Sequence, residues 1–149
     1  MANVILWKNQ STGNLLTTEL NALADGAIAV DAADYVNGTD KFQFADFVLD
    51  AVWAAACDAD AVVELHIFYK HDNTLYADGE DGDLANPQPS GNSLHGIFNV
   101  GAEADVVQQI LRVPLNPFDF KIGVVNLTGQ AMAATLNTVD MFPYNDEIQ

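Results

Sequence analysis

The sequence predicts an all-β protein, a single antiparallel β-sandwich of the jelly-roll type with about eight strands and little helix. Three features support this fold class. Several segments alternate between apolar and polar residues, as half-buried strands do. Turn residues recur between those segments at strand-like intervals. No long stretch shows the apolar spacing of an amphipathic helix. The clearest strand runs from 63 to 70, and one parity of it is apolar: Val63, Leu65, Ile67 and Tyr69.

The first half of the chain leaves two elements open. Residues 15–23 fit a first strand or a short helix, and residues 52–61, which are rich in alanine and aspartate, fit a helical turn or a loop. Asn-Gly at 37–38 predicts a turn, because this pair tolerates positive φ angles. Apolar side chains lie on both parities of 41–52, which predicts a strand buried on both faces or one that carries a bulge.

In the strand from 63 to 70, the second parity is mostly polar. Glu64, His66 and Lys70 are expected to face outward, which makes His66 a surface histidine, and Phe68 is the exception. Residues 71–93 form the longest polar, turn-rich region, interrupted by a short strand at 74–77. A loop of this length inside a small domain is usually functional or disordered.

The second half predicts four further strands, at 93–100, 106–115, 118–126 and 136–142. In the third of them, one parity is expected to face inward: Phe118, Phe120, Ile122 and Val124.

Length and the absence of a linker or repeat predict one domain over 1–149, with 1–14 and 142–149 as candidate contact arms. A chain of 149 residues can bury a core without cross-links. The N-terminus lacks the pattern of a secretory signal, and no run of about 18 apolar residues predicts a membrane helix.

Charge is the strongest compositional feature. Five Lys and Arg against 21 Asp and Glu give a formal net charge of -16. Phosphate backbones and anionic membranes are bound through basic side chains, so the sequence predicts no nucleic-acid partner and no membrane partner. Hydrophobic residues make up 50% of the chain, which predicts a folded protein rather than an acidic disordered one.

No motif predicts an enzyme. The chain lacks a G-x-S-x-G nucleophile elbow and both common glycine-rich phosphate loops. Cys57 has no histidine nearby in sequence and is predicted to be a buried apolar residue. Glu64 with another carboxylate could form a pair for sugar hydrolysis, but such a pair depends on a separation that sequence does not give.

One acidic loop has the composition of a calcium site. Asp78, Glu80, Asp81 and Asp83 offer the dense carboxylates that calcium uses, but the loop departs from the EF-hand pattern, which favours a solvated loop tip. His66, His71 and His95 with Asp78 lack the paired spacing of a zinc site. The sequence therefore predicts no cofactor and no metal, with Ca²⁺ at this loop as the alternative.

Aromatic side chains could supply a stacking face for carbohydrate, although on strands they more often belong to a core or an oligomer contact. The candidates are Trp7, Trp53, Tyr69, Tyr76 and Tyr144.

A family resemblance rests on segments that carry no catalytic residue. The segments are LTTELNALADG (16–26), FQFADFVL (42–49), RVPLNPFDFKIGVVNLTG (112–129), AATLNTV (133–139) and PYN (143–145). Together they resemble small virion structural proteins of tailed bacteriophages, and most of all capsid decoration (cement) proteins.

The resemblance implies a non-enzymatic β-sandwich subunit that binds an assembled capsid and stabilises it by mass action. Its implied partners are the major capsid protein and copies of itself, as a dimer or trimer. It would be made in the host bacterial cytoplasm and lie on the capsid surface of the virion. The alternative is a tail, baseplate or fibre component that binds host carbohydrate.

The near-neutral ends of the chain are the predicted partner contacts. They could equally be edge strands of the core, and the sequence leaves both interpretations open. The residues concerned are Val4, Ile5, Leu6 and Trp7 at one end and Met141, Phe142 and Tyr144 at the other.

Overall fold

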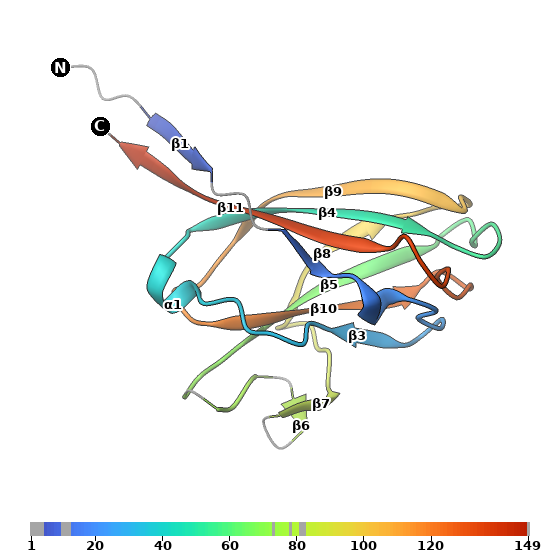
Figure 1. Ribbon diagram of the computed structural model, residues 1–149, viewed down its shortest axis with the longest axis horizontal. Coiled ribbons are helices and arrows are strands. Elements are labelled where there is room, and N and C mark those ends of the chain that lie inside the picture. Colours follow the sequence, from blue (N-terminus) through green and yellow to red (C-terminus); the bar gives the residue numbers. More distant parts are fainter. Residues whose placement is uncertain (1–4, 10–12, 73, 78, 81–82, 149) are drawn as a thin grey trace.

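A computed structural model of the 149-residue chain shows two antiparallel sheets packed face to face, which confirms the predicted β-sandwich (Figure 1). The structure describes residues 5–9, 13–72, 74–77, 79–80 and 83–148. Within these ranges, no helix is long and apolar enough to span a membrane.

The first sheet has five strands, in the order β1, β11, β4, β9, with β2 also paired to β11. Their bounds are β1 (Ile5–Asn9), β2 (Asn14–Leu16), β4 (Phe44–Val52), β9 (Asp105–Pro114) and β11 (Thr138–Ile148). The second sheet has four strands, in the order β3, β10, β5, β8. Their bounds are β3 (Ile28–Val30), β5 (Val62–Tyr69), β8 (Leu94–Asn99) and β10 (Phe120–Leu127).

A 3₁₀ turn, a single helical turn and a two-stranded hairpin complete the described structure. The open segment at 15–23 forms the end of β2 followed by a 3₁₀ turn, η1 (Thr18–Leu20). The Asn-Gly turn forms a single helical turn, α1 (Asn37–Asp40). In the long polar region, β6 (Gly79–Glu80) pairs with β7 (Asp83–Pro87).

The strand order is that of a jelly roll, as predicted. Each early strand pairs antiparallel with a late one: β2 with β11, β3 with β10, β4 with β9 and β5 with β8. The chain therefore folds as one long hairpin whose two arms wrap into two sheets, and the region around β6 and β7 lies at its tip.

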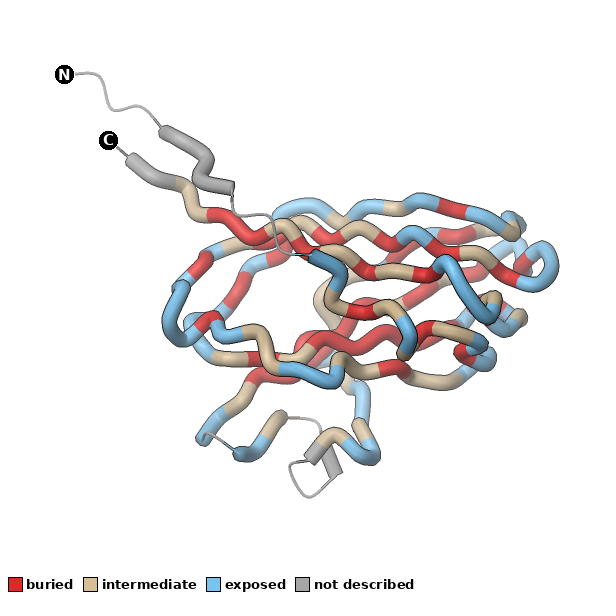
Figure 2. Tube along the Cα trace, in the orientation of Figure 1, coloured by how far each residue is buried: buried red, intermediate tan, exposed pale blue. Residues whose placement is uncertain are grey.

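The core lies between the sheets and follows strand parity. In β4 the buried residues alternate with half-buried or exposed ones along the strand (Figure 2). The core-facing residues of β4, β5 and β10 are Ala45, Phe47, Leu49, Ala51, Val63, Leu65, Ile67, Tyr69, Phe120, Ile122 and Val124.

Two predictions of side-chain orientation and one predicted strand end were wrong. Phe118 is 47% exposed, because β10 begins only at Phe120 and Phe118 precedes it in a turn. His66 is 2% exposed, because loop residues cover the outer face of β5 at that position. The last strand does not end at Phe142 but continues through Pro143 to Ile148.

The two ends of the chain pair with each other. Ile5–Asn9 lies antiparallel to Tyr144–Ile148. This two-stranded ribbon extends beyond the body of the sandwich (Figure 1).

Gly123 lies in β10 between β3 and β5, where neighbouring atoms leave room only for a small residue. A Cβ there would lie 2.8 Å from the Phe68 ring and 3.2 Å from the Ala29 carbonyl oxygen. We expect Gly123→Ala to lower the free energy of unfolding by about 1–3 kcal/mol through overpacking. Denaturant unfolding of the two proteins measures this difference.

The control is Gly91→Ala, because a Cβ at Gly91 would meet nothing within 4 Å. This variant should stay within about 0.5 kcal/mol of wild type. Equal stability of Gly123→Ala and Gly91→Ala would contradict the close packing.

Candidate functional site

A groove of about 450 Å³ opens at one end of the sandwich, where β5 ends, β10 begins and α1 closes the side. The backbone joins these elements: the Lys70 N–H donates to the Asp119 carbonyl at 2.8 Å, and Tyr35 bridges to Phe120. The lining residues are Gly38, Lys70, His71, Asp72, Pro117, Phe118 and Asp119.

Asp34 organises one wall of the groove. Its carboxylate accepts hydrogen bonds from Lys70 Nζ, at 2.6 Å, and from the Tyr76 hydroxyl. Burial alone would raise the pKa of Asp34, but the hydrogen bonds from Lys70 and Tyr76 and the nearby charges of Lys70 and Lys121 lower it overall. Asp34 therefore stays ionised and partly buried, with its side chain 24% exposed.

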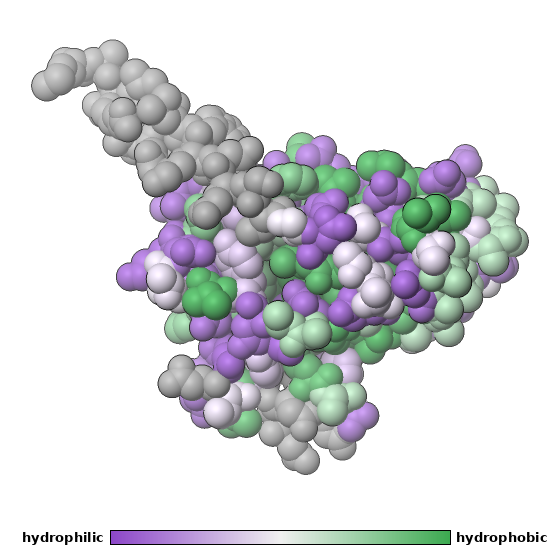
Figure 3. Space-filling model, viewed as in Figure 1, coloured by the Kyte–Doolittle hydropathy of each residue, from purple (hydrophilic) through white to green (hydrophobic). Residues whose placement is uncertain are grey.

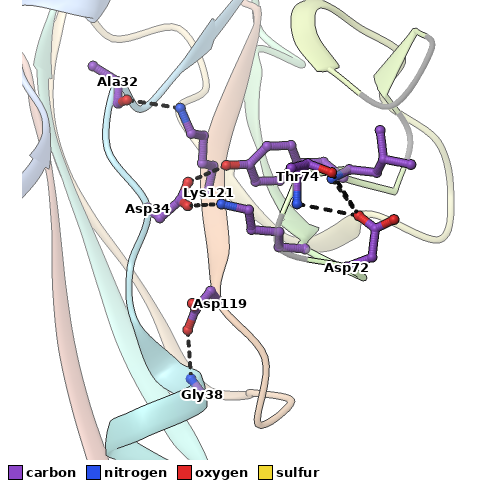
Figure 4. A network of polar contacts seen from close by, with 10 residues as sticks. Ala32, Asp34, Gly38, Asp72, Thr74, Asp119 and Lys121 are labelled. Carbon is purple, nitrogen blue, oxygen red and sulfur yellow. Dashed lines mark hydrogen bonds and ion pairs between the residues drawn. The ribbon is translucent and has the colours of Figure 1, made fainter.

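The Tyr76 ring lies between two ammonium groups. Lys70 Nζ is 5.4 Å and Lys121 Nζ is 5.8 Å from its centroid, within the range of cation–π attraction. Lys121 also donates to the Ala32 carbonyl at 2.9 Å (Figure 4). This network ties the segment at 71–77 to the segment at 31–36, so the wall of the groove is fixed.

Two carboxylates in the groove are held by backbone donors (Figure 4). Asp119 accepts from the Gly38 N–H at 2.8 Å, and a Cβ at Gly38 would lie 3.0 Å from the same oxygen. Asp72 accepts from the N–H groups of Thr74, at 3.3 Å, and Leu75, at 2.9 Å, and the Leu75 hydrogen bond is the main cause of its lowered pKa. Both carboxylates keep their orientation without a ligand.

Phe118 and His71 supply the aromatic part of the groove. Their ring centroids are 6.3 Å apart with planes at 49°, and both side chains are exposed. Pro117 precedes Phe118 in the turn between β9 and β10 and lines the same groove. Phe118 is the groove residue that sequence parity placed wrongly. The turn residues Pro114 and Pro117 were the available signal that β10 starts later.

Asn37 is fully buried and holds together the backbone segments beside the groove. Its Nδ2 donates to the carbonyls of Phe42, at 3.1 Å, and Asn116, at 2.7 Å, while its Oδ1 accepts from the Phe42 N–H at 2.9 Å. Asn116 in turn donates its N–H to the Tyr69 hydroxyl at 3.1 Å. The sequence signalled only a turn at Asn37 and gave no sign of this bracing.

The predicted contact arms meet, but they do not form an exposed apolar surface at the C-terminal end. Met141 is fully buried, Tyr144 is 3% exposed and Phe142 is half-buried, because this part of β11 lies between β4 and its other neighbours. At the N-terminal end, the backbone of Ile5, Leu6 and Trp7 belongs to β1, and Val4 lies outside the described residues.

The acidic loop is described only in part. Glu80 and Asp83 are paired through their backbone, while Asp78 and Asp81 lie outside the described residues. Among the residues that the structure describes, no three His, Cys, Asp or Glu side chains gather as metal ligands would. Calcium at this loop stays the alternative to the predicted solvated loop tip.

Most of the predicted stacking aromatics are buried. Trp53, Tyr69 and Tyr144 belong to the interior, and Tyr76 is part of the Asp34 network. Trp7 lies in β1, where its backbone pairs with Asp146. Among the four whose side chains the structure describes, no shared exposed face forms, and the aromatic rings that line the groove are those of Phe118 and His71.

A hydroxyl, an imidazole and a carboxylate are in line on the outer face of the second sheet. His66 Nδ1 is 3.0 Å from Ser93 Oγ, and His66 Nε2 is 3.2 Å from Glu64 Oε2. Ser93 is 2% exposed, and its Oγ also bonds to the backbone of Ser90. A nucleophile needs access to substrate, so this row of groups serves to anchor the loop at 90–93.

Cys57 is buried, as predicted, and burial raises the pKa of its thiol. The protonated thiol is the unreactive form, which fits a packing role.

Comparison with known proteins gave likenesses in structure alone. No family model matches the sequence, and no curated protein matches it. Among solved structures, the CBM36-1 domain of a multidomain xylanase from the hindgut metagenome of Trinervitermes trinervoides has 14% identity and a TM-score of 0.46, with 97% of each chain covered.

Two further structures are similar at a lower level. The carbohydrate-binding module CBM36 in complex with calcium and xylotriose has 13% identity and a TM-score of 0.44, covering 97% of this chain and 100% of that one. Turnip yellow mosaic virus has 10% identity and a TM-score of 0.36, covering 100% of this chain and 85% of that one. At these scores and identities, the likenesses do not establish what this chain binds.

The lowered pKa of Asp34 makes a prediction about stability and pH. A carboxyl whose folded pKa lies below its unfolded value of about 3.9 contributes stability above that pH, and the contribution is lost as pH falls through the folded pKa. We expect Asp34→Asn to cost about 1 kcal/mol at neutral pH, with the difference from wild type narrowing below about pH 4.

Urea unfolding at several pH values measures this difference. Asp60→Asn is the matched control, because Asp60 is an exposed aspartate at the opposite end of the sandwich. A difference for Asp34→Asn that stays constant on acidification would contradict the role given to Lys70 and Tyr76.

Proposed function

We propose that this chain is a binding domain whose ligand is a neutral carbohydrate, held in the groove between α1 and the segment at 71–77. The observation that carries the proposal is the combination of an exposed aromatic ring, Phe118, with two oriented carboxylates, Asp72 and Asp119, in one open groove.

The chemistry of the lining matches a sugar better than other small ligands. A sugar has an apolar face of C–H groups that packs on an aromatic ring, and hydroxyls that donate to carboxylates. An anionic ligand would face Asp72 and Asp119, while the ammonium of Lys70 is already paired with Asp34. A fully apolar ligand would displace water from the carboxylates of Asp72 and Asp119 without replacing its hydrogen bonds, which is unfavourable.

The side chains are oriented before any ligand arrives. Asp119 and Asp72 are held by backbone N–H groups, and Lys70 is held by Asp34. Side chains that are already fixed lose less conformational entropy on binding, so even a shallow groove can hold a ligand.

The expectation of a capsid decoration protein stays a prediction. Jelly rolls occur both in viral capsids and in lectin domains, so this strand order fits either role. The groove supports the alternative that the sequence left open, carbohydrate binding.

The test is titration with neutral oligosaccharides while backbone NMR shifts are followed. Xylohexaose, cellohexaose and a glycan array of neutral sugars are suitable probes. We expect saturable binding with shifts centred on Lys70–Asp72 and Pro117–Asp119. Phe118→Ala should raise the dissociation constant for the oligosaccharide about tenfold, because one aromatic contact is lost.

Leu136→Ala is the control, because Leu136 is another large exposed apolar residue, 78% exposed and outside the groove lining. Asp119→Asn separates charge from geometry, since an amide oxygen can still accept from the Gly38 N–H. An array without any neutral sugar bound, or binding unchanged in Phe118→Ala, would contradict the proposal.

A further inference from the structure

The two strands that face each other along one side of the sandwich, β8 and β9, lack the charges that edge strands usually carry. β8 (Leu94–Asn99) has no Asp, Glu, Lys or Arg, and neither has the stretch Val106–Leu111 of β9. The inner strands β4, β5 and β10 each carry at least one charged residue. Free edges in monomeric proteins are normally protected by charge or proline, so this distribution is the reverse of the usual one.

The same side of the molecule exposes large apolar side chains. Val107 is 65% and Leu111 63% exposed on β9, and Ile97 is 50% exposed on β8. Apolar surface is visible along the edge formed by β9 (Figure 3). In the described part of the chain, β9 pairs with β4 on one side and has no ladder partner on the other.

We propose that the free edge of β9 pairs with the same edge of a second copy of this chain, antiparallel across a two-fold axis. A second copy is the occupant because the strip is uncharged and complementary to itself. Copies that each carry a net charge of -16 repel each other over the rest of their surface, and this strip is where two of them can approach most closely. A two-fold interface also requires a surface that is complementary to itself.

β9 meets that requirement when Gln109 lies on the two-fold axis. Residues directly opposite each other in a sheet point to the same face, so outward residues must pair with outward ones. With Gln109 opposite Gln109 of the second copy, Val107 lies opposite Leu111 of the second copy. The two-fold axis repeats this apolar pair on the other side.

A bulge sets the length of the paired edge. The register of β4 against β9 shifts between Ala45 and Phe47, opposite Leu111 and Arg112. Arg112 has a φ of 55° and donates its N–H to Asp46 Oδ1 at 2.7 Å. Regular pairing ends at the bulge, so in this register it covers Val107 to Leu111 of each copy.

The first experiment is sedimentation equilibrium of wild type, Gln109→Glu and Gln88→Glu. We expect a wild-type dimer. Gln109→Glu should raise its dissociation constant at least about tenfold, because two carboxylates would then lie directly opposite each other. Gln88→Glu adds the same charge at an exposed loop position away from β9, and it should leave the dimer unchanged.

The second experiment tests the register itself. Gln109→Cys should form a disulfide-linked dimer on a non-reducing gel, because the two new thiols would face each other on neighbouring strands. The native Cys57 is buried and does not compete. Gln88→Cys should not cross-link at matched concentration.

Three results would overturn the proposal. They are a wild-type protein that is monomeric throughout the micromolar range, a dimer that Gln109→Glu leaves intact, and Gln109→Cys that cross-links no faster than Gln88→Cys. None of them bears on the groove, so this proposal and the carbohydrate proposal fail separately.

Discussion

The antiparallel pairing of the first half of the chain with the second is the constraint on which the rest of the structure depends. Because β3 pairs with β10, β4 with β9 and β5 with β8, successive connections alternate between the two ends of the sandwich. The connections at 31–43, 70–93 and 115–119 therefore all gather at one end. These three connections form the groove, although they are far apart in sequence.

In this acidic chain, three of the Lys and Arg side chains are held by acceptors within the protein. Lys70 is paired with Asp34, Lys121 donates to the backbone of Ala32, and Arg112 is paired with Asp146. Each of them fixes a segment near a sheet end or a strand edge. The chain has only 5 Lys and Arg, and these three already have partners within the protein. They therefore do not form a basic patch that could bind an anionic partner.

Sequence parity predicted the inner strands well, because alternation is a local property of a strand with one face in the core. It succeeded for the apolar parity of β5, where Val63, Leu65 and Ile67 are buried. For residues 41–52 it predicted a strand buried on both faces or one with a bulge. β4 has one buried face, and its pairing with β9 is irregular between Ala45 and Phe47. Parity failed for His66, because whether an outward face stays open depends on a distant loop. That loop, which carries Ser93, is brought over β5 by the tertiary fold.

The groove was harder to predict than the fold for the same reason. Asp34, Lys70 and Lys121 come from three segments, and their meeting depends on long-range pairing that no local pattern records. Phe118 was placed inward because parity was extended past the true start of β10. Phe118 shares the parity of Phe120, but alternation orients side chains only within a strand, and Phe118 lies in the turn before β10.

The groove and the free edge of β9 are geometrically linked. β9 runs toward the groove end of the sandwich, where Leu115 and Asn116 lead directly into the turn that carries Phe118. In an antiparallel β9 pair, the two copies run in opposite directions, so their grooves open toward opposite ends of the dimer. Such a dimer would place its two ligand sites apart and facing away from each other. It would therefore join two separate ligand chains and gain little from binding both sites to one short chain.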